Sequence, residues 1–239
     1  MTGGAGNDSV SPPADGAAGV KRRPTILFDL DGTLIDTIEL IVAAARYAFA
    51  SRPGPAPTEL EIRQTIGRPL VTQFGPWLVD DTDLPFLVAK YREHQLEHHD
   101  RLTTVYPGIP KAVASLHGAG CVMGIVTSKV GFMAERALTH VGLRDYMRVV
   151  IASDSTTRHK PDPEPVLVAM ERIGARPEET TFVGDSPYDM MAAVAAGVRP
   201  IGVAWGAFET DVLIAAGARV VLEQVAHLGA LLMAADVTG

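Results

Sequence analysis

A single cysteine, Cys121, occurs in the 239-residue sequence, so no disulfide bond can form within the chain. Cys121 begins the apolar run 121–126, where a small buried side chain is expected rather than a reactive thiol. A chain without structural disulfides is typical of a reducing compartment, and we expect a cytoplasmic protein.

Long apolar stretches are also lacking. No run approaches the roughly 20 residues that a membrane-spanning helix requires, so we expect no membrane partner. Residues 1–23 are rich in glycine, alanine, proline and serine and have no basic start followed by an apolar stretch. We therefore predict a disordered tail over 1–23 rather than a secretory signal.

The sequence also lacks an excess of positive charge. The chain carries 21 basic and 28 acidic residues, a net charge of -7. Because a protein that binds nucleic acid non-specifically needs a basic surface, we expect no nucleic-acid partner. Hydrophobic residues make up 47% of the chain, enough to bury a sizeable core in one large domain or in a core with a small insert.

What the sequence does contain is a regular alternation of short apolar runs and helical stretches. Buried strands are predicted at 25–28, 121–126, 148–152, 181–183, 201–204 and 219–222. Helices are predicted at 111–117, 132–141, 164–173, 190–196 and 208–216, and a glycine closes four of them (Gly142, Gly174, Gly197 and Gly217). This alternation predicts an α/β fold with a doubly wound parallel sheet.

One segment, 38–104, breaks the alternation because it shows no convincing strand. Residues 38–50 and 83–99 read as helices, and Thr58 with Glu61 has the spacing of a helix capping box. We predict an inserted α-helical cap over 38–104, with the core formed by 24–37 and 105–239.

Two features of this predicted cap bear on function. The loop 65–70 places Arg68 at an exposed tip, where it suits a substrate carboxylate or a second phosphate, although a surface arginine without a role fits equally well. His94, His98 and His99 have near-helical spacing on a polar helix. A metal site is conceivable there, but a solvated face is the favoured interpretation.

Polar residues gather where the predicted strands end, the edge at which open parallel sheets bind ligands. They are Asp29, Asp31, Thr127, Ser128, Lys160, Asp185 and Asp189. Four carboxylates at one edge would repel one another unless a cation intervened, and hard oxygen ligands suit Mg²⁺. A hydroxyl and an ammonium group beside them suit a phosphoryl group.

These residues resemble the motifs of the haloacid dehalogenase-like phosphatase superfamily. The first motif is Asp29-Leu30-Asp31-Gly32-Thr33, the second is Thr127, the third is Lys160, and the fourth is Gly184-Asp185 with Asp189. All four occur in the order that the superfamily requires. The insert after the first motif is similar to the helical cap of the subgroup that includes phosphoglycolate phosphatases.

The resemblance implies a role for each residue. Asp29 would be the nucleophile and a metal ligand, and Asp31 the general acid and base, with its backbone carbonyl on the metal. Thr127 and Lys160 would hold the phosphoryl group, with Ser128 beside them. Asp185 would bind the metal directly, whereas Asp189 would reach Lys160 or a metal-bound water.

The expected activity is Mg²⁺-dependent hydrolysis of a small phosphate monoester, such as phosphoglycolate, through an aspartyl phosphate. A pyrophosphatase, a nucleotidase and a phosphotyrosine phosphatase remain open. A haloacid dehalogenase is disfavoured because it would not need an acid at Asp31. A phosphomutase is disfavoured because no His-Thr-x-x-x-Lys element is found, and a silent binding module because no motif carboxylate is missing.

Overall fold

The computed structural model describes residues 24–229, so the tail predicted over 1–23 lies outside the described residues. Its centre is a six-stranded sheet in the order β5-β4-β1-β6-β7-β8, with every pairing parallel. The strands are β1 (Thr25–Phe28), β4 (Val122–Val126), β5 (Met147–Ile151), β6 (Thr180–Gly184), β7 (Arg199–Val203) and β8 (Val220–Leu222). The predicted α/β fold is confirmed, and the strand order reverses direction beside β1, where such sheets bind ligands.

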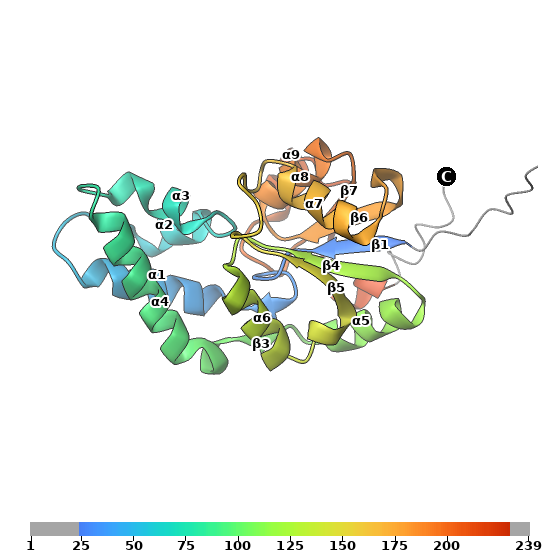
Figure 1. The fold of residues 1–239 in the computed structure, drawn as a ribbon, viewed down its shortest axis with the longest axis horizontal. Coiled ribbons are helices and arrows are strands. Elements are labelled where there is room, and N and C mark those ends of the chain that lie inside the picture. The colour runs from blue at the N-terminus through green and yellow to red at the C-terminus, as the bar shows by residue number, and fades with distance from the viewer. Residues whose placement is uncertain (1–23, 230–239) are drawn as a thin grey trace, which may run out of the picture.

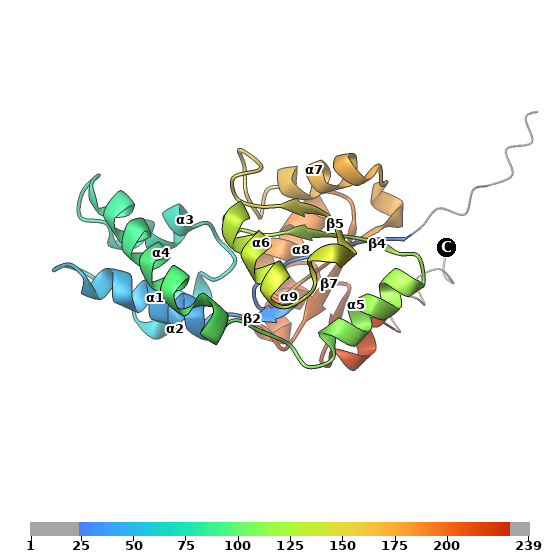
Figure 2. The same ribbon diagram turned by 60° about the horizontal axis from the view of Figure 1, so that its bottom comes forward.

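Helices cover both faces of this sheet (Figures 1 and 2). One face carries α5 (Ile109–Gly118) and α6 (Gly131–His140), and the other carries α7 (Glu164–Ile173), α8 (Pro187–Ala195) and α9 (Thr210–Ala215). Alternate side chains of β1 divide between the two layers: Ile26 and Phe28 pack with α5 and α6, while Leu27 packs with α7 and α8. All four residues of β1 are buried, as a central parallel strand requires.

The helix ends largely follow the predicted signals. Gly142, Gly174, Gly197 and Gly217 all have positive φ angles, as expected of glycines that end helices. The predicted start at residue 190 was wrong, however, because α8 begins at Pro187. Ser186 caps this helix and Pro187 occupies its first turn, a start signal that the apolar pattern alone does not show.

Residues 38–102 form a separate helical lobe, which we call the cap (Figure 1). It contains α1 (Ile38–Ala50), α2 (Glu59–Gln64), α3 (Leu70–Phe74) and α4 (Asp83–Leu102). The cap has its own apolar core, in which the ring of Phe74 stands edge-on to Phe49 and Tyr91 at centroid distances of 5.0 and 5.7 Å. The capping box predicted at Thr58 and Glu61 is present.

A two-stranded antiparallel ribbon joins the cap to the sheet. It consists of β2 (Ile35–Asp36) and β3 (Thr104–Val105). Strands of two residues carry too little pattern to be predicted, and none was. Short 3-10 helices complete the described elements: η1 (Gly75–Trp77), η2 (Arg144–Tyr146) and η3 (Pro177–Glu179).

The structure also bears on the predictions for Cys121 and for membrane-spanning helices. Cys121 is 6% exposed and belongs to the main apolar core, as predicted for a small buried residue. Within residues 24–229, every helix is too short or too polar to cross a bilayer.

Candidate active site

The carboxyl ends of β1, β4 and β6 bring three of the predicted residues to one place. Asp29, Thr127 and Asp185 each come directly after their strand, and all are at least 95% buried. The backbone N–H of Asp29 donates to the carbonyl of Val183 at 2.8 Å, so β6 fixes its position. The N–H of Thr127 donates in the same way to Ile151 of β5 at 2.9 Å.

A cluster of buried carboxylates lies at this edge. Asp29, Asp185 and Asp189 each present one oxygen, and the three oxygens lie within 4.8 Å of one another. Lys160 supplies the neighbouring positive charge: its Nζ lies 2.9 Å from Asp29 Oδ1 and 2.6 Å from Asp189 Oδ1. Its remaining donor reaches the carbonyl of Val126 at 3.2 Å. One ammonium group therefore faces three carboxylates.

The pKa values reflect this excess of negative charge. Burial, reinforced by the charge of Asp189, raises the pKa of Asp29 well above its ordinary value. The same causes raise the pKa of Asp185 to about 7. Burial alone would lower the pKa of Lys160, but Asp189 and Asp29 outweigh it and raise that pKa. The cluster therefore favours an additional cation.

The donor set fits a hard divalent cation such as Mg²⁺, since every candidate ligand is a carboxylate oxygen. The oxygens of Asp189 are already engaged, because Oδ1 pairs with Lys160 and Oδ2 accepts from the N–H and hydroxyl of Ser186 at 3.1 and 2.6 Å. Asp185 is oriented by Thr33, whose hydroxyl donates to Oδ1 at 3.2 Å, and by the N–H of Ala207 at 2.8 Å from Oδ2.

Glycines close the backbone around these carboxylates. A Cβ atom at Gly32 or Gly206 would overlap the side chain of Asp185, and one at Gly184 would overlap Asp189. Gly32 also has a φ of 82°, which disfavours any other residue. The close approach explains why the first and fourth motifs need glycine beside their acids.

Asp31 stands apart from the cluster. Its Oδ1 accepts from the Lys129 ammonium and from the Thr37 hydroxyl, both at 2.6 Å. The side chain of Lys129 is only 6% exposed, so this ion pair is well shielded from water. Lys129 and Thr37 were not predicted as partners of Asp31. The available signal was position alone, since Lys129 follows Thr127 by two residues.

The cap reaches the sheet through the loop that contains Arg68. The hydroxyl of Ser128 donates to the carbonyl of Gly67 at 2.5 Å, so this predicted substrate-binding residue here contacts the cap. The guanidinium group of Arg68 lies 4.5 Å above the ring of Tyr188 on α8. Arg68 lines a cavity of about 290 Å³ together with Asp29 and Asp31.

The interpretation of the three cap histidines as a solvated face was wrong for one of them, because His94 and His98 are partly exposed but His99 is not. His99 is fully buried, and its Nδ1 lies 2.7 Å from Asp100 Oδ1. The rings of His94 and His98 stand edge to face with centroids 4.3 Å apart. Over residues 24–229, the aspartate cluster is the one group in which three or more potential metal ligands converge.

Comparisons with known proteins agree with this geometry. The family model described as "Haloacid dehalogenase-like hydrolase" matches residues 26–203. The chain is 39% identical over 176 residues to the pyrophosphatase PpaX of Halalkalibacterium halodurans, covering 73% of this chain and 80% of that protein. It is 36% identical over 206 residues to a Dickeya dadantii protein named "Probable phosphatase IndB", covering 84% and 90%. The crystal structure of a hydrolase from Pseudomonas syringae superposes with a TM-score of 0.80 at 25% identity, over 91% of this chain and all of that one.

Proposed function

The chain belongs to the haloacid dehalogenase-like hydrolases, as its four motifs suggested, and from this membership we propose that it is a Mg²⁺-dependent phosphatase of a small phosphate monoester. The observation that carries the proposal is the placement of Asp29. It is a buried carboxylate beside Lys160, Asp185 and Asp189, while Asp31 is held separately.

In the proposed first step, an oxygen of Asp29 attacks the phosphorus atom and the bond to the leaving oxygen breaks. Asp31 donates its proton to that oxygen, and the leaving group departs as an alcohol while the phosphoryl group stays on Asp29. Lys160 holds Asp29 in position, and Thr127 binds the phosphoryl oxygens with nearby backbone N–H groups. Asp29 and Asp185, with the backbone carbonyl of Asp31, are the proposed Mg²⁺ ligands.

In the second step, Asp31 takes a proton from water, whose oxygen attacks the phosphorus atom. The bond to Asp29 breaks, which releases inorganic phosphate, restores the carboxylate of Asp29 and leaves Asp31 protonated for the next cycle. When bound, Mg²⁺ would offset the negative charge of the carboxylates and of the phosphoryl group, so that one anion can approach another. Asp189 acts through Lys160 and Ser186 rather than as a ligand in this proposal.

The cap is proposed to act as a lid over this site and to set the choice of substrate, with residues 38–104 as the lid and 24–37 and 105–239 as the catalytic core. The core motifs contact only the phosphoryl group, so the leaving group must be recognised elsewhere. A closed lid would also exclude water while the aspartyl phosphate exists.

A second candidate substrate is pyrophosphate, because relatives at up to 39% identity are named pyrophosphatases. Phosphate release from pyrophosphate, phosphoglycolate, nucleotides, phosphotyrosine and p-nitrophenyl phosphate, ranked by kcat/KM, would separate the candidates. Absence of phosphate release from all of them would contradict the proposed function.

Removal of the metal should lower turnover at least about 100-fold, since a bound cation contributes several kcal/mol of transition-state stabilisation. The measurement is phosphate release after dialysis against EDTA, followed by titration with Mg²⁺. Enzyme taken through the same dialysis without EDTA is the control. Undiminished turnover in excess EDTA would show that the carboxylate cluster works without a metal.

Replacing Arg68 with alanine should raise the KM for phosphoglycolate or pyrophosphate about tenfold, because a charge-assisted contact to the second anion is lost. The KM for p-nitrophenyl phosphate, which has no second anion, should rise less. Steady-state kinetics with both substrates measures the difference, and Arg46→Ala, an exposed arginine of α1, is the matched control. An equal rise for both substrates would mean that Arg68 acts only by stacking on Tyr188.

A further inference from the structure

The cavity beside Asp29 and Asp31 continues into the cap, and the cap half of its lining is largely aliphatic. Five cap side chains form what we call the apolar wall: Ile41, Ile66, Leu70, Leu84 and Val88. At about 290 Å³ the cavity is close to the lower end of pockets that hold whole metabolites. Placing a second charged phosphoryl group against these five side chains is unfavourable, because none of them can replace its hydration.

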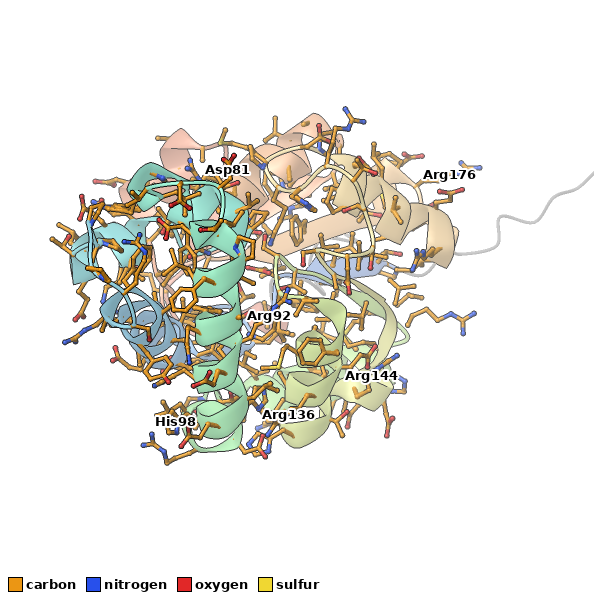
Figure 3. The ribbon with its side chains drawn as sticks, turned by 60° about the vertical axis from the view of Figure 1, so that its left-hand side comes forward. Asp81, Arg92, His98, Arg136, Arg144 and Arg176 are labelled. Carbon is orange, nitrogen blue, oxygen red and sulfur yellow. The ribbon has the colours of Figure 1, made fainter. Side chains whose placement is uncertain are left out.

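A single stripe of α4 supplies much of this lining. Leu84, Val88, Tyr91, Arg92 and Gln95 all line the cavity, and their spacing of three and four residues places them on one side of the helix. Figure 3 shows Arg92 midway along α4, on the side that faces the sheet. The stripe changes character along the helix, because it begins with two aliphatic residues and ends with three polar ones.

The polar end of the stripe lies nearer to the reacting carboxylates. Tyr91 and Gln95 lie toward Leu102, where α4 ends beside β3. That strand pairs with β2, and Thr37, which follows β2, donates to Asp31. Gln95 is 5% exposed and donates to the Tyr91 hydroxyl at 2.9 Å. Leu84 lies eight residues before Arg92, about 12 Å along the helix axis. A leaving group bound along α4 would therefore meet Arg92 first, and then Val88 and Leu84 of the apolar wall.

Among the described residues, no carboxylate forms an ion pair with Arg92, whereas Arg52 and Arg63 of the same cap pair with Asp83 and with Glu39 and Glu59. A guanidinium group that lines a cavity without a carboxylate suits an anionic group of a ligand.

We propose that the substrate is the phosphate ester of a 2-hydroxy carboxylic acid with an apolar side chain. Arg92 shares the carboxylate with Arg68, which lines the same cavity, and the side chain of the acid lies on the apolar wall. This inference rests on the proposed phosphatase activity and narrows its substrate class. Phosphoglycolate has the carboxylate but no side chain, so it leaves the wall uncovered, and pyrophosphate has no group for the wall at all.

The test is a homologous series: phosphoglycolate, then the 2-phosphooxy esters of propanoic, butanoic and hexanoic acids, with hexyl phosphate and pyrophosphate for comparison. We expect kcat/KM to rise about threefold to fourfold per methylene group until the wall is covered. The hexanoate ester should exceed hexyl phosphate about tenfold. A flat series, or pyrophosphate as the best substrate, would overturn the proposal.

Substitutions at Arg92 and Val88 separate the contribution of the carboxylate contact from that of the apolar wall. Arg92→Gln should remove the preference for the hexanoate ester over hexyl phosphate, and Arg92→Lys should restore part of it. Val88→Thr, a change of similar volume, should weaken the dependence on chain length. Arg101→Gln, an exposed arginine at the end of α4, is the matched control and should keep both preferences. Retention of the carboxylate preference in Arg92→Gln would contradict the assignment.

Calorimetric titration of the Asp29→Asn variant with the same esters separates this inference from the proposed reaction. Affinity that rises with chain length supports the subsite even if the wild-type enzyme hydrolyses none of the esters, in which case the proposed reaction alone is wrong. Affinity that does not depend on chain length overturns the inference, whatever the turnover.

Discussion

Replacing Asp29 with asparagine should lower kcat by at least about 10⁴-fold, because loss of an attacking group removes the covalent route altogether. The amide is nearly isosteric but is a poor nucleophile. No phosphoenzyme should accumulate when the variant is mixed with substrate and the reaction is quenched with acid. The measurement is steady-state phosphate release together with trapping of the phosphoenzyme.

The same variant should be more stable than the wild-type protein when no metal is bound. Burial and Asp189 raise the pKa of Asp29, so ionisation of Asp29 disfavours the folded state at any pH above its unfolded pKa. A neutral amide removes that penalty, and the melting temperature in EDTA should rise. Asp211→Asn, at an exposed acid in the first turn of α9, should change neither turnover nor stability. Turnover near the wild-type rate in Asp29→Asn would rule out the nucleophile assignment.

Replacing Lys160 with methionine should affect both stability and catalysis. Without the ammonium group, the buried carboxylates of Asp29 and Asp189 lose their ion pairs, which costs about 3–5 kcal/mol of unfolding free energy. The kcat should fall about 10³-fold, because a fixed positive charge no longer stabilises the phosphoryl transfer. Urea unfolding in EDTA and steady-state kinetics in Mg²⁺ measure the two effects.

A double variant distinguishes the two roles of Lys160. Lys160→Met with Asp189→Asn removes one buried charge of each sign, so much of the lost stability should return while turnover stays low. Lys111→Met on α5, an exposed lysine, is the matched control and should behave like the wild type. If the double variant regains turnover as well, Lys160 serves the fold alone.

The fold was predictable because its signals are local. A buried parallel strand reads as a short apolar run, and helices on both faces follow from the alternation. The four motifs come just after or beside these strands, so their positions indicated a common site. The glycines that end helices were recognisable for the same reason, since only glycine readily adopts the positive φ at those positions.

Other features depend on contacts between distant segments and could not be predicted. Lys129 pairs with Asp31 across 98 residues of sequence, and the Gly67 carbonyl accepts from Ser128 across 61. Nothing in the residues around Lys129 distinguishes it from a surface lysine. His99 was assigned to a solvated face because its neighbours are polar, yet tertiary packing buries it completely.

The ribbon of β2 and β3 has a mechanical consequence. The chain passes between sheet and cap twice, through β2 and through β3, and these two strands are hydrogen-bonded to each other. The cap therefore cannot twist as freely as it could if a single strand connected it to the sheet. Its easiest motion is a swing about the ribbon, with α4, whose last residue Leu102 lies next to β3, as the lever arm. The 20 residues of α4 span about 30 Å, so a rotation of roughly 10° would displace the far end of the helix by about 5 Å. Thr37, which holds Asp31, directly follows β2. The axis of the swing therefore passes beside Asp31, the proposed general acid, which moves least while the far end of the cap moves most.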